Sequence, residues 1–141
     1  MIAYCRAVGV LVDYFAATAD ELGTEELLET GGPAGAGWPH VDCKGWLDSL
    51  RDLAAELTGR ERSEFGRDEL VHADSEEEGP WLTRVDDDVV AALAGVDDDR
   101  LAGYADDASL HEHEADRNRA LRDLARSAEE HGRQVYCWSS L

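Results

Sequence analysis

The sequence predicts an α+β fold, a single domain in which a small sheet that includes the N- and C-terminal strands packs against several helices. Apolar and polar residues alternate near both ends of the chain, as they do in strands, and the middle carries apolar residues at helical spacing. A chain of 141 residues also suits one domain of about 100–150 residues. Strands at the two ends pair most simply with each other in one sheet.

The first element is a strand followed by a helix. In "GVLVDYFAATADEL", Val10, Val12 and Tyr14 alternate along the strand. Thr18 and Glu21 then have the spacing of a capping box, which predicts that a helix starts there and continues through "ADELGTEELLET". The alternative is a helix that breaks at Gly23 and is capped again by Thr24. The Gly/Pro cluster "GGPAGAG" ends this helix in a loop.

The strongest helical pattern lies in "VDCKGWLDSLRDLAAELTG". Asp42 is placed to cap the start of this helix, and Gly59 to end it. The apolar stripe of the helix consists of Trp46, Leu47, Leu50, Leu53, Ala54 and Leu57. We therefore expect Trp46 to be a buried core residue, four residues before Leu50 on the same face.

The middle of the chain is predicted as a loop, a strand and two short helices. Residues 60–79 have little periodicity and end in an acidic run, which indicates a surface loop. "PWLTRV" is a short strand. Two similar blocks follow, "VDDDVVAALAG" and "VDDDRLAGY", and in each an Asp precedes a short apolar helix whose backbone N–H groups it can cap.

The chain closes with a long helix and a strand. The helix is expected over residues 110–131 and ends at Gly132. Its buried side is predicted to carry Leu121, Leu124, Ala125 and Ala128. In "RQVYCWSSL", alternation places Val135 and Cys137 on one face of the final strand and Tyr136 and Trp138 on the other.

Charge and cysteine content exclude several classes of function. The chain has 32 acidic and 13 basic residues, a formal charge of −19, which repels nucleic-acid phosphates and anionic lipids. We expect no nucleic-acid partner and no membrane partner. Three cysteines without a C-x-x-C pair favour a reduced compartment. No apolar run reaches the roughly 20 residues of a membrane span, and no secretory signal is evident, so a cytoplasmic protein is expected.

His111, Glu112, His113 and Glu114 crowd four potential metal ligands into four consecutive positions. In a strand the two histidines could share a metal ion, whereas in a helix residues two apart diverge by about 200°. The helical interpretation is favoured here, and the H-E-x-x-H pattern of zinc peptidases is absent. We therefore predict no metal site and no cofactor, with His111 and His113 as the weak candidates for metal ligands.

His40 and Cys43 form the one local pair with a pattern that could support catalysis. A thiol at a helix N-terminus can have a lowered pKa and become a nucleophile. No acidic residue nearby in the sequence orients His40, and unpaired cysteines are more often packing residues. His40 and Cys43 are therefore weak catalytic candidates. The aspartate runs lack the glycine-containing loop that binds calcium, and helix capping accounts for them better.

Several stretches together resemble the YfbM-like family of uncharacterised bacterial proteins, a domain of unknown function. "GVLVDYFAATADEL" resembles the family's opening strand and first helix, and "VDCKGWLDSLRDLAAELTG" resembles its D-K-x-W-x-x-L-x-x-L-L-T-G helix. "VDDDVVAALAGVDDDRLAGY" and "AEEHGRQVYCWSSL" resemble its later helices and closing strand. The resemblance covers most of the chain and implies an α+β fold, but no activity and no catalytic residues. It also places the start of the opening strand near Val8, so residues 1–7 are expected to be a disordered extension.

The sequence thus predicts one domain over residues 1–141 whose biochemical function is not evident. We interpret it as a non-enzymatic binding module for an unidentified protein partner. The alternative is a small enzyme or ligand-binding protein with a pocket near His40, Cys43 and Trp46.

Overall fold

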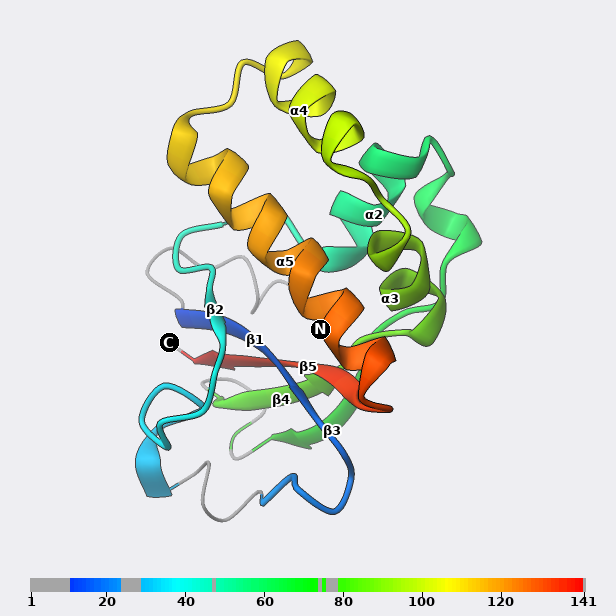
Figure 1. Ribbon diagram of the computed structural model, residues 1–141. Coiled ribbons are helices and arrows are strands. Elements are labelled where there is room, and N and C mark those ends of the chain that lie inside the picture. The colour runs from blue at the N-terminus through cyan, green and yellow to red at the C-terminus, as the bar shows by residue number, and fades with distance from the viewer. Residues whose placement is uncertain (1–10, 24–28, 47, 74, 76–78, 141) are drawn as a thin grey trace.

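A computed structural model of the protein describes residues 11–23, 29–46, 48–73, 75 and 79–140 (Figure 1). Its elements, in order, are β1 (Leu11–Ala17), β2 (Val41–Asp42), α2 (Leu50–Thr58), the 3-10 turn η2 (Arg62–Glu64), β3 (Glu69–Ala73), β4 (Trp81–Arg84), α3 (Asp87–Ala94), α4 (Asp98–Asp107), α5 (Glu112–Glu130) and β5 (Gln134–Ser140). A single sheet with helices packed against it confirms the α+β prediction. Residues 1–7, expected to be a disordered extension, lie outside the described residues. No helix in the described ranges is both long and apolar enough to cross a membrane.

The terminal strands form the centre of the sheet. The strand order is β2-β1-β5-β4-β3, and each neighbouring pair is antiparallel. β1 and β5 pair along their whole lengths, from Leu11 opposite Ser140 to Ala17 opposite Gln134. The two strands predicted at the ends of the chain therefore do pair with each other, as their alternating patterns indicated.

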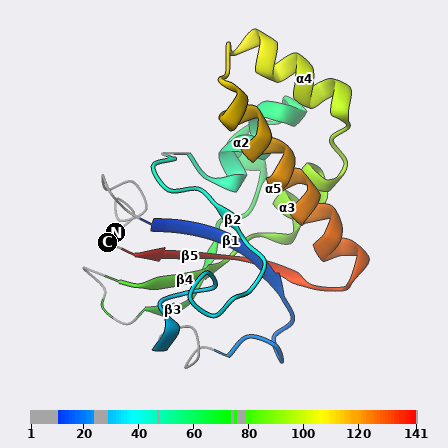
Figure 2. The ribbon, with the colours of Figure 1, turned by 60° about the vertical axis from the view of Figure 1, so that its left-hand side comes forward.

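Helices cover one face of the sheet. Figures 1 and 2 show α5 and α3 above the strands, with α4 farther from the sheet. Val135 and Cys137 of β5 point toward this helical layer and belong to the larger buried cluster. The cluster also includes the apolar faces of the helices, among them Leu50, Leu53, Leu57, Val89, Leu93, Leu121, Ala125 and Ala128. The buried side predicted for the last helix is confirmed, with Leu124 only partly buried.

The opposite face is covered by a loop. Phe15, Leu82, Tyr136 and Trp138 form a second buried cluster there, which confirms the predicted division of β5 into two faces. The segment 29–40, which contains the "GGPAGAG" loop, packs against this cluster through Trp38, whose ring meets that of Phe15 edge-on at 5.7 Å. Within the predicted loop, Gly32 and Pro33 are buried, whereas Gly31, Ala34, Gly35 and Gly37 are exposed.

The first turn after β1 keeps its predicted cap but forms no helix over residues 19–23. The N–H of Thr18 donates to Glu21 Oε1 at 2.9 Å, and the N–H of Glu21 donates to Thr18 Oγ1 at 3.0 Å. These are the two bonds of a capping box. Only a turn follows over residues 19–21, so the predicted start of the helix at Thr18 is wrong, whereas Glu29 and Thr30 at its predicted end are helical.

Helix α2 starts later than its apolar stripe indicated. Its N-cap is Ser49, whose Oγ accepts from the Asp52 N–H, while the Asp52 carboxylate accepts from the Ser49 N–H. Asp42, predicted as the cap, lies in β2, and its carboxylate accepts from the Lys44 N–H in a turn. The predicted end is correct, because Gly59 adopts the left-handed conformation with φ 74°.

The segment 60–79, expected to be a loop, contains an edge strand of the sheet. Glu69–Ala73 pairs with β4 through an irregular register between Leu70 and His72. This bulge leaves Val71 without an opposite residue, and such a kink discourages an edge strand from pairing with other chains. Phe65, before the strand, is buried, and the Arg51 guanidinium donates to its carbonyl at 3.2 Å.

Candidate functional site

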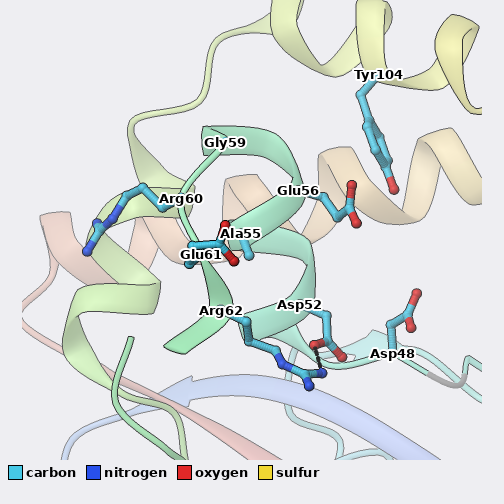
Figure 3. A pocket seen from close by; sticks show the side chains of 9 residues that line it. All are labelled: Asp48, Asp52, Ala55, Glu56, Gly59, Arg60, Glu61, Arg62 and Tyr104. Carbon is cyan, nitrogen blue, oxygen red and sulfur yellow. Dashed lines mark hydrogen bonds and ion pairs between the residues drawn. The ribbon is translucent and has the colours of Figure 1, made fainter. Parts of the chain in front are cut away.

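An open groove lies between α2, the turn after it, and α4 (Figure 3). Its volume is about 510 Å³, within the range typical of ligand sites. It is lined by Asp48, Asp52, Ala55, Glu56, Gly59, Arg60, Glu61, Arg62 and Tyr104, and we refer to it as the α2–α4 groove. Four of these nine residues are acidic and two are basic, so its chemistry is mainly that of carboxylates.

The local geometry of α2 brings three carboxylates to the groove. Asp52 and Glu56 are four residues apart within the helix and therefore project from the same face. Asp48 precedes the N-cap and lies beside them in Figure 3. This face is opposite in character to the buried face that carries Leu50, Leu53 and Leu57.

Asp52 is held in place by its neighbours. Its carboxylate accepts from Arg62 Nη1 at 2.7 Å and from the Ser49 N–H at 3.0 Å. Burial opposes the charge of Asp52, but the hydrogen bonds from Arg62 and Ser49 outweigh burial and lower the pKa of this carboxyl. Asp52 therefore stays ionised and is a structural anion at the base of the groove.

The two arginines of the groove are engaged within the protein. Arg62 forms the ion pair with Asp52 described above. Arg60 Nη2 lies 2.9 Å from the Asp88 carboxylate of α3, and its guanidinium stacks 4.2 Å from the centroid of the Phe65 ring. The positive charges in the lining are therefore largely compensated internally.

Asp48, Glu56 and Glu61 are the other acids of the lining, and Asp48 and Glu56 are the two that lie near Tyr104 in Figure 3. Within the described part of the chain, neither carboxylate takes part in a hydrogen bond or ion pair of the kind that holds Asp52. Figure 3 shows the Tyr104 side chain descending from α4 toward both of them. Burial raises the pKa of the Tyr104 hydroxyl, and the negative charges of Glu56 and Asp48 raise it further. The field in this part of the groove therefore favours cations.

A smaller cavity of about 110 Å³ adjoins the groove and shares Asp48, Asp52, Glu56 and Tyr104 with it. Trp46 and Arg117 are among its other walls, and the Arg117 guanidinium lies 4.6 Å from the centroid of the Trp46 ring. Trp46 also meets Tyr14 edge-on at 6.3 Å. Trp46 is only partly buried and precedes α2, so its predicted place on the stripe of that helix is wrong.

The predicted pair His40 and Cys43 does not join this site. His40 is exposed, and its Nδ1 lies 2.9 Å from the carbonyl oxygen of Trp38. Cys43 is buried, with 2% of its surface exposed, and burial raises the pKa of its thiol to about 12. The thiol is therefore protonated near neutral pH, a state that does not favour nucleophilic attack. The two cavities described above are lined by neither His40 nor Cys43.

The two histidines of the "HEHE" stretch are closer than expected. His111 is the N-cap of α5 and lies outside the helix, while His113 lies within its first turn. Their rings are nearly parallel, with centroids 5.7 Å apart, so the divergence expected of two helical residues is wrong here. Among the described residues, no group of three or more His, Cys, Asp or Glu side chains is placed to hold a metal ion.

The groove residues were not identified from the sequence. The only local signal was the spacing of Asp48, Asp52 and Glu56 on the polar side of the predicted helix. This spacing is also typical of a solvated helix face, and it does not reveal that Tyr104, some fifty residues later, lies opposite.

Comparison of the chain with family models, curated proteins and solved structures finds no match.

Proposed function

We propose that the protein is a non-enzymatic binding module whose α2–α4 groove receives a basic segment of a partner protein. The observation that carries this proposal is the lining of the groove, where Asp48 and Glu56 face Tyr104 while Arg60 and Arg62 are paired with other residues. Lys or Arg side chains of a partner would complement the two carboxylates.

Tyr104 adds a second kind of contact for the same partner. A guanidinium or ammonium group over a tyrosine ring contributes about 0.5–1 kcal/mol at an exposed site. Arg60 over Phe65 and Arg117 over Trp46 show that this chain already stacks arginines on aromatic rings nearby. An arginine-containing segment would therefore combine ion pairing with stacking in the groove.

The charge of the whole molecule supports the same class of partner. A formal charge of −19 attracts basic proteins over a distance and raises their association rate, especially at low ionic strength. The carboxylates of the groove would then provide the local specificity that net charge alone does not.

The test measures binding of a short fluorescein-labelled peptide of alternating arginine and serine by fluorescence anisotropy. The double variant Asp48→Asn with Glu56→Gln should weaken binding by about 1 kcal/mol, roughly fivefold in Kd, because it removes two partly exposed ion pairs. A matched double variant, Glu129→Gln with Glu130→Gln, makes the same change in net charge at the exposed end of α5 and should change Kd less than twofold. Equal weakening by both double variants, or no binding by the wild type, would contradict the proposal.

A further inference from the structure

A second groove lies beside the end of β1, next to α5. Its volume is about 520 Å³. It is lined by Ala16, Ala17, Glu21, Trp38, Pro39, Leu124, Ser127 and Arg133, and we refer to it as the β1-edge groove. None of these residues lines the α2–α4 groove, so the two sites are separate.

The hydrogen-bonding register identifies which backbone groups face this groove. In an antiparallel pair, hydrogen-bonded positions recur at every second residue. Tyr14 lies opposite Val41, and the Val12 carbonyl accepts from the Cys43 N–H at 2.7 Å. Val12 and Tyr14 therefore direct their backbone polar groups toward β2, and the next residue to do so is Ala16.

The chain interrupts the ladder at this next position. A continued register would require Pro39 to pair with Ala16, but proline has no N–H to donate, and Pro39 lines the groove instead of extending β2. In the described part of the chain the β1–β2 ladder contains no pair beyond Tyr14 and Val41. Because Ala16 lines the β1-edge groove and has no partner in the β1–β2 ladder, we infer that its backbone N–H and C=O face this groove.

The walls of the groove favour apolar side chains. Ala16 points to the helical side of the sheet, where Leu124 of α5 is also partly buried, and Trp38 and Pro39 form the other side. A residue paired with Ala16 would place its own side chain on the same face, against Leu124. Valine and similar residues fit such a position.

Among the described residues that line the groove, the two charged ones, Glu21 and Arg133, form an ion pair. Arg133 Nε and Nη2 donate to the two carboxylate oxygens of Glu21, at 3.0 and 3.3 Å. Because these groups neutralise each other, the groove suits a neutral segment better than a charged one.

We propose that the β1-edge groove binds an extended, uncharged peptide segment of a partner protein, which adds as a strand beside Phe15–Ala17. Its backbone pairs with the N–H and C=O of Ala16, and an apolar side chain rests on Leu124. Strand addition at an open sheet edge is a common mode of peptide recognition, in which backbone bonds give affinity and side-chain pockets give specificity.

The experiment follows amide hydrogen exchange of Ala16 by NMR, with the capped peptide acetyl-Thr-Val-Thr-Val-Thr-amide as the probe. At saturating peptide, exchange at Ala16 should slow at least tenfold, because its N–H becomes a strand hydrogen bond. A second peptide with both valine nitrogens methylated keeps the side chains but loses the donors at the positions that face Ala16. This peptide should leave exchange at Ala16 unchanged.

Two variants test the geometry. Pro39→Val restores an N–H at the exposed position opposite Ala16, so β2 can extend along β1. Exchange at Ala16 should then slow without peptide, and added peptide should have little further effect. Leu124→Ala removes the apolar wall and should raise the concentration of peptide needed for half-maximal protection severalfold, while thermal unfolding confirms that the variant is folded.

Three results would overturn the proposal. The first is unchanged exchange at Ala16 in the wild type at millimolar peptide. The second is equal protection by the two peptides, which would mean that only side chains are bound. The third is slow exchange at Ala16 in the wild type before any peptide is added.

Discussion

Asp13 is a carboxylate buried within the sheet. It has 8% of its surface exposed and lies between Asp42 of β2 and Trp138 of β5 in the strand register. Burial raises the pKa of this carboxyl above its ordinary value of 3.8. The positive charge that His40 can carry acts against the rise, and the negative charge of Asp42 adds to it.

A raised pKa for Asp13 predicts how its contribution to stability depends on pH. The folded state binds the proton more tightly than the unfolded state, so this contribution is greatest below pH 3.8 and is lost as pH rises through the raised pKa. Asp13→Asn, which mimics the protonated form, should therefore be more stable than wild type at pH 7, and the difference should shrink toward pH 4. Urea unfolding across this range measures the effect. Asp106→Asn, at an exposed position, serves as the control, and a difference that grows on acidification would contradict the assignment.

Single residues also show where local patterns mislead. The sequence placed Trp46 in the core because of its spacing from Leu50, yet Trp46 lies between the Tyr14 ring and the Arg117 guanidinium and is only partly buried. It placed Cys43 at a helix N-terminus, where a thiol is activated, yet Cys43 follows a strand and is buried. In both cases the surroundings of the side chain are formed by residues that are distant in the sequence, so local spacing could not predict them.

At the scale of elements, Arg122 joins α5 to the junction between α3 and α4. It is buried, with 3% of its surface exposed, and its Nη1 donates to the Val96 carbonyl at 2.8 Å. Its Nη2 donates to the Asp98 carboxylate in the first turn of α4, and its Nε to Asp123. One guanidinium thereby fixes the relative positions of three helices.

Loss of Arg122 should therefore destabilise the whole helical layer. We expect Arg122→Ala to lower the free energy of unfolding by about 2 kcal/mol, because the buried side chain loses its packing and its hydrogen bonds, whereas the exposed carboxylates of Asp98 and Asp123 are hydrated in its absence. Arg119→Ala, which removes an exposed pair with Asp116 at 3.7 Å, should change it by no more than about 0.5 kcal/mol. Chemical denaturation of both variants measures the difference, and similar values for the two would show that Arg122 does not hold these helices together.

The boundaries of elements were predictable where the caps are local. Gly59 and Gly132 end their helices with positive φ, as expected, because a left-handed residue needs no distant partner. The start of α2 was not predictable from local sequence. Asp42 and Ser49 are both residue types that cap helices well, and only the pairing of Asp42 with β1 decides between them. The strand β3 lacks a local pattern and depends on β4.

At the scale of the whole molecule, the sheet is enclosed because the segment 29–40 covers its second face. Gly32 makes this possible. It has φ 105°, and a Cβ at this position would lie 2.4 Å from Nε1 of Trp138. Gly32 therefore allows two things that a residue with a side chain would not: a positive φ, and a close approach of the backbone to the indole ring of Trp138.

Gly32→Ala should accordingly destabilise the protein more than the backbone conformation alone explains. Gly37→Ala, in the same segment with φ 76° and no atom near the added Cβ, isolates the backbone effect of about 1–2 kcal/mol. Gly32→Ala should cost at least about 2 kcal/mol more, because the clash with Trp138 is added. Thermal and urea unfolding of the two variants measure this, and equal destabilisation would mean that the loop does not pack on Trp138.

Local sequence patterns were sufficient to predict the fold class, the terminal strands, the helices α3, α4 and α5, and the two faces of β5. These features depend on periodicity and capping within a few residues, which a single stretch of chain encodes completely. Three features became evident only from the folded chain: β3 forms a sheet edge, the segment before β2 packs on the second face, and Asp48 and Glu56 lie near Tyr104 in a groove. Each of these depends on contacts between segments far apart in the chain, and local sequence patterns carry no information about which distant segment will supply the partner.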